Sequence, residues 1–450
     1  WRARLDLGGK PNLIHAILKA AQALLVPVAG VIAMVILLPL LAGYILLVKR
    51  KIIADQPDQR DQPDRPLAPP ASAQRLLQPF EDVWALALQP DTLPRHADKL
   101  LFWFAPMLAA AIALLACSAI PFGPAFPMAD LNVGLLFILA VASLGIYAIL
   151  LGGPSANNHD SLDALRSAAR YLSYGMVAAL ALASALMLAG SLSLRQIVQA
   201  QYDQGTWFIL YAPVGFFAYL AASIVQVRHP SGDPGSGAGF LRALGILAEY
   251  ANMIVFAGLA TTLFFGGWLR PFARFHDHFL STPVEMLDAL PALLFLALAF
   301  YGASAAPQQR SKAHKIAIGS GAGLCVLLAA VMAASLFAAP GVMAAVHGAF
   351  WFLAKALACL YGFVWLRFTF PLYRFDRLMR VAWQFLIPLT LANLIGVGIA
   401  IVLREQLGVN PFFPSLVMTV ATAGVAAWLW GGRNERGARE SASPAADGGW

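Results

Sequence analysis

The chain has 450 residues, of which 60% are hydrophobic and only 12% charged, and its formal net charge is +8. No single buried core can hold so many apolar side chains, so the composition excludes a water-soluble globular protein and predicts a polytopic membrane protein in contact with the lipid bilayer. In a membrane protein, excess lysines and arginines are first explained by their preference for the cytoplasmic side of the membrane. We therefore expect no nucleic-acid partner. The three cysteines lie in apolar runs without the spacing of a zinc, iron–sulfur or disulfide pattern, so any redox centre is expected on a partner.

Eleven apolar runs are each long enough to cross a bilayer as a helix, which takes about 20 residues. They lie at residues 22–48, 100–121, 131–152, 165–190, 206–227, 240–267, 286–303, 316–338, 346–366, 380–403 and 412–430. No cleavable signal sequence is evident, so the first run is also read as a span. The predicted fold is therefore an all-α polytopic membrane protein of about eleven transmembrane helices.

Lysines and arginines are distributed unevenly between the two sides that these spans define. Alternate segments place 22 of them on one side and 8 on the other, and Lys355 inside a span completes the total of 31. Because positive residues accumulate in cytoplasmic segments, the richer set, which includes residues 49–99 and 367–380, is predicted to be cytoplasmic. The N-terminus is then on the opposite side, and we expect a bacterial inner membrane.

Two parts of the cytoplasmic segment 49–99 differ from the spans. Residues 49–74 are rich in Pro, Asp, Gln and Arg, which is typical of an irregular loop. Residues 75–89 place several large apolar side chains near one helical face and acidic side chains opposite, which predicts an amphipathic helix in the membrane interface.

Two ionisable residues lie deep inside predicted spans, where a charge is costly and marks a candidate functional site. Glu249 is either a proton-relay group or a carboxylate satisfied by a tyrosine or an arginine of another helix. Lys355 needs a partner or a long reach to the membrane surface, and we favour such a structural role over a place in a proton path. The sequence HDH at 276–278 offers no third ligand, and no metal is assigned.

The segment FTFPLYRFDRLMR at residues 368–380 is more polar and more aromatic than membrane anchoring requires. Pro371 interrupts the helix after a span that ends near Arg367. Aromatic rings beside guanidinium groups then suit a planar ligand or a docking surface. The alternative is an aromatic belt with arginines on the cytoplasmic side.

Extended to RFTFPLYRFDRLMRVAWQFLIPLTLANL at residues 367–394, this segment closely resembles the most characteristic sequence of the subunit 1 family (also called the H-subunit family) of complex I, the proton-pumping NADH:quinone oxidoreductase. Further blocks resemble the family in the same order along the chain. They are RLLQPFEDVWAL, ADKLLFWFAPMLA, ALRSAARYLSYG and LAEYANMIVFAGLATTLFFGGW.

The resemblance implies a membrane subunit at the junction with the peripheral redox arm, which forms part of a quinone chamber and the first part of a carboxylate path for protons. It implies membrane and peripheral subunits as partners, quinone bound as substrate, and no metal or flavin in this chain. The proton-path candidates are Glu249 and Lys355. The quinone or junction candidates are Arg367, Tyr373, Arg374, Asp376, Arg377 and Arg380, with Gln78, Phe80, Asp82 and Trp84 in the amphipathic helix.

Several acidic groups of the family are absent from this chain. Lys49 stands where the family usually has glutamate at the end of the first span, and Gly175 stands where it usually has glutamate in the fourth. The acidic loop after the fifth span is replaced by the shorter RHPSGDPGSGAG. These losses fall along one proposed pathway, so we expect proton coupling to be weakened or rerouted.

The resemblance also divides the chain into four parts. Residues 1–270 hold the first six family-like helices, and residues 271–345 form an inserted helical pair. Residues 346–404 hold the remaining family-like helices with the signature loop 367–380, and residues 405–450 add a helix and a cytoplasmic tail. Because the insertion is a pair of helices, it returns the chain to the same side of the membrane.

Two other functions stay open. One is a degenerate paralogue that anchors a redox or hydrogenase-type module as a scaffold, without quinone chemistry. The other is an independent ion or solute transporter, which is disfavoured because no internal repeat or pair of broken helices indicates a site at the membrane midplane.

Overall fold

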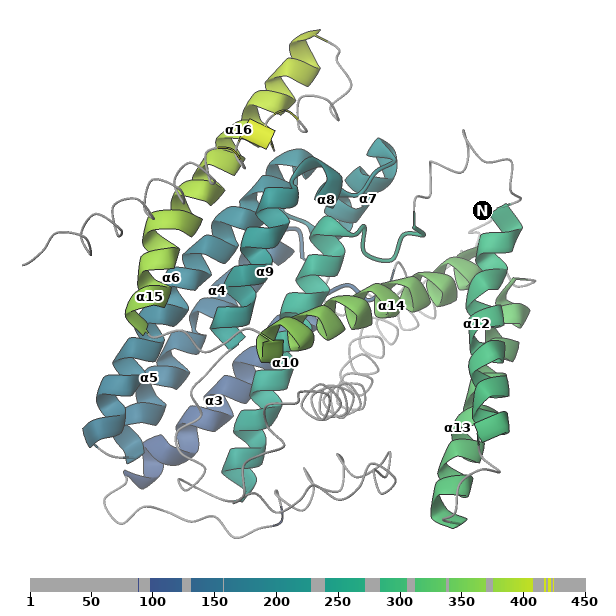
Figure 1. Cartoon of the computed structure of the whole chain (residues 1–450), viewed down its shortest axis with the longest axis horizontal. Coiled ribbons are helices and arrows are strands. Elements are labelled where there is room, and N and C mark those ends of the chain that lie inside the picture. Colours follow the sequence, from purple (N-terminus) through teal and green to yellow (C-terminus); the bar gives the residue numbers. More distant parts are fainter. Residues whose placement is uncertain are drawn as a thin grey trace, which may run out of the picture.

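The computed structural model describes residues 98–123, 131–156, 158–227, 239–271, 284–305, 312–336, 340–369 and 375–407, together with residues 88, 417, 420, 421 and 424. Within these ranges every regular element is a helix, and most helices run side by side in one bundle (Figure 1). The predicted all-α membrane fold is confirmed. The predicted first span, the loop 49–74, the amphipathic helix apart from Leu88 and most of the last span lie outside the described residues.

Six helical stretches are long and apolar enough to cross a membrane. They are Lys99–Ser118, Gly134–Gly152, Leu162–Ala189, Ala243–Phe264, Met343–Arg367 and Phe375–Gln406. Three shorter apolar helices cover Pro213–Val227, Ala289–Ser304 and Gly319–Ser335. Each of these nine stretches coincides with one of the spans predicted from hydropathy, because a long apolar run can satisfy its backbone groups in lipid only as a helix.

Two predicted spans are divided. The run 131–152 forms α4 (Gly134–Ser143) and α5 (Gly145–Ala156), and the run 206–227 forms α8 (Phe208–Tyr211) and α9 (Pro213–Val227). Pro213 has no backbone N–H to continue a preceding helix, so it begins a new one. A further helix, α7 (Leu194–Gln204), occupies a connection for which the sequence predicted no element, and it buries Leu194, Ile197 and Val198 against the bundle.

Helix α10 (Phe240–Phe264) is the most buried of the candidate spans that the structure describes. It packs mainly against α3 (Lys99–Ser118) and α14 (Pro340–Thr369), and α9 connects it to α6 (Asn158–Ala189). Small side chains line the closest contacts, including Ala113, Ala181, Ala222 and Ala260, each fully buried. Small residues allow helix backbones to approach closely, which supplies van der Waals contact where lipid removes the hydrophobic driving force.

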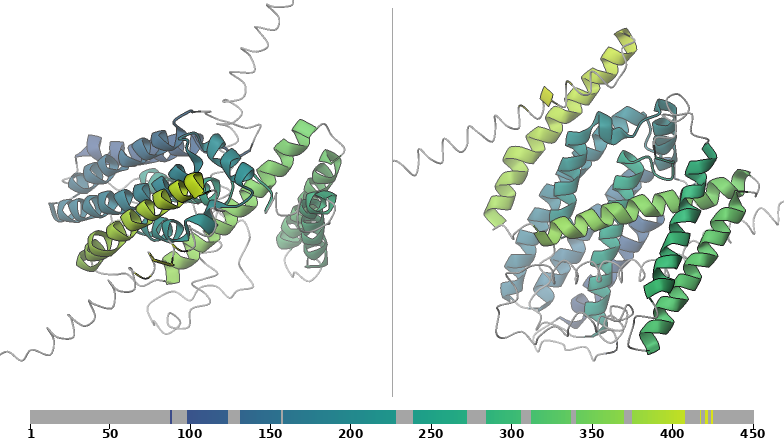
Figure 2. Two further views of the ribbon diagram at one scale, coloured as in Figure 1. Left: turned by 90° about the horizontal axis from the view of Figure 1, so that it is seen from above. Right: turned by 45° about the vertical axis from the view of Figure 1, so that its right-hand side comes forward.

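The pair α12 (Val284–Ala305) and α13 (Lys312–Ser335) stands outside this bundle (Figures 1 and 2). The two helices pack mainly against each other, and α14 connects them to the bundle. The buried hydroxyl of Ser335 lies 2.9 Å from Nε2 of His347 on α14. Most of their apolar surface is exposed, with Phe300 78% accessible, as expected for helices that face lipid or another protein.

The last described span begins with α15 (Phe375–Val381), continues through a π-helical turn at Ala382–Leu386 and ends with α16 (Ile387–Leu407). A π-helical turn adds a residue to the helix and changes the direction of the side chains on either side of it. This helix packs along α6, so the signature segment is carried on the same side of the bundle as the start of α6.

Candidate functional site

Glu249 on α10 and Arg367 in the last turn of α14 form an ion pair between two helices of the bundle. The Glu249 side chain is only 14% exposed and the Arg367 side chain 15%. A second guanidinium nitrogen of Arg367 lies 3.7 Å from the sulfur of Met253, one turn along α10 from Glu249. Glu249 is thus satisfied by an arginine of another helix, which is one of the two alternatives that the sequence left open.

The signature segment continues directly from this pair. Helix α15 has Asp376 in its first turn, where the helix dipole stabilises a negative charge, and Arg380 near its end, where the helix continues into the π-helical turn. Asp376, Arg377 and Arg380 are exposed at the surface of the described bundle. Tyr373 and Arg374 lie outside the described residues, as do Gln78, Phe80, Asp82 and Trp84.

Helix α6 fixes the position of the signature helix through two hydrogen bonds. The hydroxyl of Tyr174, itself buried, donates to the carbonyl of Leu378 at 2.9 Å. The indole N–H of Trp383 donates to the hydroxyl of Ser173 at 3.2 Å. Sequence reasoning missed these positioning residues, although adjacent Ser and Tyr inside an apolar span are a usable signal because buried polar groups need partners.

Gly175, the next residue of α6, lies against Gln226 of α9. A Cβ at position 175 would come 3.0 Å from the amide nitrogen of Gln226. Gln226 is 6% exposed and its amide nitrogen donates to the carbonyl of Tyr171 at 3.3 Å. A neutral amide therefore occupies the space beside the position where the family sequence usually has glutamate.

The side chain of Lys355 extends from α14 to the end of α10. Its ammonium donates to the backbone carbonyls of Phe265, Gly267 and Leu269, just after the end of α10. Glu249 and Lys355 therefore both bind across the contact between α10 and α14, but at different levels, and the structure does not bring them together. The partner that the sequence required for Lys355 is a set of main-chain oxygens.

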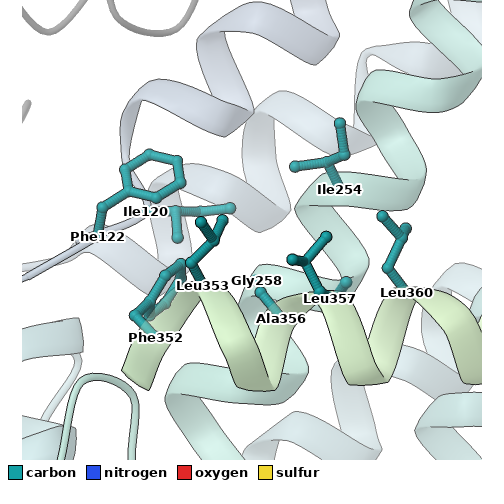
Figure 3. A pocket seen from close by; sticks show the side chains of 10 residues that line it. Ile120, Phe122, Ile254, Gly258, Phe352, Leu353, Ala356, Leu357 and Leu360 are labelled. Carbon is teal, nitrogen blue, oxygen red and sulfur yellow. The ribbon is translucent and has the colours of Figure 1, made fainter. Parts of the chain in front are cut away.

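One small pocket lies where the end of α3 meets α10 and α14 (Figure 3). Its volume is about 20 Å³, and its lining is apolar, with Ile120 and Phe122 facing Phe352 and Leu357. A cavity of this size has room for one molecule as small as water, and an apolar lining keeps it dry. It is too small for a quinone ring, and it lies near Lys355 rather than near Glu249.

Within the described part of the chain, no group of three His, Cys, Asp or Glu side chains is arranged to hold a metal ion. Cys117 is buried, with its thiol directed at the carbonyl of Ala251 at 3.8 Å. Cys359 lies 3.9 Å from the hydroxyl of Thr261. The chemistry that this arrangement offers is therefore that of a partly buried carboxylate–guanidinium pair beside a cationic surface helix.

Comparison with known proteins connects this arrangement to a family. The sequence profile of the NADH dehydrogenase family matches residues 28–233 and 236–398. The chain is 38% identical over 393 residues to the NADH-quinone oxidoreductase H subunit 2 of Solibacter usitatus, covering 82% of this chain and 95% of that protein. It is 37% identical over 357 residues to the H subunit 1 of the same enzyme from Koribacter versatilis, covering 73% and 82%.

A third relative, the NADH-quinone oxidoreductase H subunit 2 of Rhizobium meliloti, is 32% identical over 394 residues, covering 83% of this chain and 95% of that protein. The matched regions include α10, α14 and the signature helix, so the ion pair and its surroundings lie inside the shared sequence. Each match covers most of the relative's length, so the similarity is not confined to one short motif. The chain belongs to the NADH dehydrogenase family, the family of the complex I membrane subunit 1, or H subunit.

Proposed function

We propose that this chain is the membrane subunit of a complex I-like NADH:quinone oxidoreductase at the junction with the peripheral arm, where it contributes to the quinone chamber. The names of the relatives, which match over most of their length, support the assembly. The observation that carries the proposal is the partly buried Glu249–Arg367 pair, which lies immediately before the cationic signature helix. The other subunits of the complex and a quinone substrate are the proposed partners.

In this function the electrons come from redox centres on partner subunits. Reduction of a quinone to a quinol takes two electrons and two protons, so charged groups near the junction respond to each turnover. Separation of the Glu249 carboxylate from the Arg367 guanidinium would leave each charge partly buried without its partner, which is costly. Opening and closing of this ion pair is the proposed coupling step of this chain.

The proposed orientation places the signature segment in the cytoplasm and the N-terminus on the opposite side. The excess of lysines and arginines in one set of segments supports it. With this orientation, Arg367 lies near the cytoplasmic end of α14 and Lys355 lies nearer the other side. The quinone contacts proposed for Tyr373, Arg374 and the amphipathic-helix residues Gln78, Phe80, Asp82 and Trp84 rest on the family resemblance.

A double-mutant cycle on the ion pair tests the proposal in the purified complex. Glu249→Gln and Arg367→Met each leave one charge without its partner, and each is expected to lower stability, by about 3–5 kcal/mol for a buried pair. The combination of both changes removes both charges and restores most of that stability. If Glu249 takes part in coupling, the double variant still reduces quinone in an inhibitor-sensitive reaction but translocates fewer protons per electron pair.

The matched control is the exposed pair of Asp163 and Arg166 on α6, whose closest atoms are 3.2 Å apart and whose side chains are 63–70% exposed. Neutralising either residue is expected to change stability by less than about 1 kcal/mol and to leave the proton ratio unchanged. A double variant at Glu249 and Arg367 with a full proton ratio would show that the pair is structural only.

The neutral contact between Gly175 and Gln226 favours a second candidate function, a scaffold that anchors a redox or hydrogenase-type module. Position 175 of this chain offers no carboxylate for proton transfer. The same purified complex separates the two functions. Electron transfer that is insensitive to quinone analogues, in a complex without bound quinone, supports the scaffold and contradicts the quinone-reducing subunit.

A further inference from the structure

The backbone after α10 turns so that three carbonyl oxygens point to one place. The last carbonyl groups of a helix have no partner within the helix. Gly266 and Gly267 follow the end of α10 with φ values of 74° and 53°, in the left-handed region that glycine adopts without strain. These two residues reverse the direction of successive peptide units, so the oxygens of Phe265, Gly267 and Leu269 converge instead of pointing along the helix axis.

The ammonium of Lys355 occupies the point of convergence. Its nitrogen lies 2.8 Å from the oxygen of Phe265, 3.1 Å from that of Gly267 and 2.6 Å from that of Leu269. A protonated lysine has three N–H donors and no acceptor, so its donors and these acceptors match one to one. A neutral amine has two donors, and its lone pair would then face the third carbonyl oxygen.

The indole ring of Trp207 covers another side of the same ammonium, with Nζ 5.1 Å from the ring centre. The face of an indole attracts a cation, most strongly where water is excluded. In the part of the chain that the structure describes, no carboxylate forms an ion pair with Lys355. Neutral carbonyl dipoles and an aromatic face, without a carboxylate, are the surroundings that proteins use for weakly hydrated monovalent cations.

We propose that residues 265–269 form a backbone-carbonyl site for an ammonium ion, and that this protein fills the site with its own tethered ammonium, that of Lys355. Lys355 is a positioning residue, which fixes α14 against the end of α10. Arg367 binds Glu249 of α10 twelve residues further along α14, or about 18 Å at the rise of an α-helix. Two cations at separate levels therefore set the direction of the helix that carries Arg367. This proposal does not depend on quinone reduction.

Chemical rescue tests the site in the assembled complex. Lys355→Ala removes the tethered cation and leaves the three carbonyl oxygens without donors, so the melting temperature of the complex is expected to fall by several degrees. Ammonium or methylammonium chloride is expected to restore part of that loss, since both cations carry N–H donors and fit the vacated space. Tetramethylammonium chloride at the same concentration has no N–H donor and is expected to restore nothing.

Two control variants distinguish loss of the cation at this site from loss of side-chain volume and from loss of a lysine elsewhere in the chain. Lys355→Met fills the space with an uncharged chain of similar length, so it should melt as low as Lys355→Ala and gain nothing from ammonium. Lys99→Ala, at the exposed start of α3, should melt like the wild type and show no ammonium-specific gain. The proposal is overturned if Lys355→Met melts like the wild type, or if Lys355→Ala gains equally from ammonium and tetramethylammonium.

The wild-type complex supplies a second test that needs no Lys355 variant. Reductive methylation requires access to the amine nitrogen. Exposed Lys99 is therefore expected to be dimethylated, while Lys355, enclosed by three carbonyl oxygens and an indole ring, stays unmodified, as measured by peptide mass spectrometry. Dimethylation of Lys355 in the folded complex at the rate of Lys99 would show that its nitrogen is not held by three acceptors. If Lys355→Ala does not assemble, this measurement decides the question.

Discussion

At the scale of single residues, Gly175 on α6 and Gln226 on α9 fit together, because the lack of a side chain at position 175 leaves room for the amide of Gln226. The amide of Gln226 fills the space beside Gly175 and is held there by its hydrogen bond to the carbonyl of Tyr171. Glycine inside a helix costs up to about 1 kcal/mol relative to alanine, so it persists where close approach of another group requires it. The absence of a carboxylate at position 175 is thus accompanied by a neutral side chain from the neighbouring helix.

This packing predicts how a carboxylate at position 175 will be tolerated. Gly175→Glu is expected to destabilise the complex by about 1–3 kcal/mol, because the new side chain overlaps the amide of Gln226. Gln226→Ala makes room, so the double variant should be more stable than the sum of the single changes predicts, with a coupling of about 0.5–3 kcal/mol. Thermal melting of the purified complex measures both effects.

The control for this cycle is Gly245 on α10, where an added Cβ would meet no atom within 4 Å. Gly245→Glu combined with Gln226→Ala is expected to be additive, because the two positions share no contact. The proposed packing would be contradicted if the change in melting temperature of the double variant at positions 175 and 226 equalled the sum of the changes of the two single variants. A gain of proton translocation in the double variant would show in addition that the missing carboxylate limits coupling.

At the scale of elements, α6 acts as the support for the signature helix. The sequence predicted α6 as one span and α15–α16 as another, but it did not predict which helix holds the signature segment. Hydrogen bonds from Tyr174 to Leu378 and from Trp383 to Ser173 make that connection across more than 200 residues. The π-helical turn follows immediately after α15, at Ala382–Leu386, and gives this part of the helix a fixed rotation relative to α6.

Removing one hydroxyl tests this support. Tyr174→Phe is expected to cost about 0.5–1.5 kcal/mol, the net value of one hydrogen bond. Because the lost bond holds α15, amide hydrogen exchange at Phe375–Val381 should become faster and electron transfer slower. Tyr171→Phe is the matched control, since it removes an equivalent bond from α6, which goes to the carbonyl of Ala142 on α4, at 2.7 Å, and not to α15. Equal exchange in the two variants would contradict a special role for Tyr174.

At the scale of the whole molecule, the described residues form one helical bundle and a helical pair beside it. Helices α12 and α13 lie within the predicted insertion 271–345 and touch the rest of the described structure chiefly through α14 (Figure 2). Because a pair of antiparallel spans returns the chain to its starting side, its presence does not change the orientation of α14. Because the pair contacts the bundle chiefly through α14, we expect the core of the bundle to form without it.

Excision of the pair tests this separation. A variant in which a short flexible linker replaces residues 276–338 is expected to retain the bundle, since α10 keeps its contacts with α3, α6, α9 and α14. Assembly with the partner subunits, measured by native gel and mass spectrometry, should survive if the pair faces lipid. Excision of the segment from α3 to α5, which packs into the core, should abolish assembly. Loss of assembly in the first variant would identify the pair as an interface with another protein of the complex.

The helical membrane fold, the nine apolar helical stretches of the described residues and the family could all be predicted from the sequence. These properties depend on composition and hydropathy within windows of about 20 residues, and on motifs that are continuous in the chain. The sequence also identified Glu249 and Lys355 as buried charges that need partners, because a charge inside a span is costly wherever the helix lies.

The identity of those partners depends on how the helices pack in three dimensions. Glu249 pairs with Arg367, 118 residues away, and Lys355 binds the carbonyl of Phe265, 90 residues away. Hydropathy does not show which helices become neighbours. Every residue has a main-chain carbonyl, so the sequence does not show which carbonyls will bind Lys355; their direction depends on the turn at Gly266 and Gly267. The physical reason is that a window of sequence fixes how a helix forms, while packing between helices fixes which of its polar groups meet.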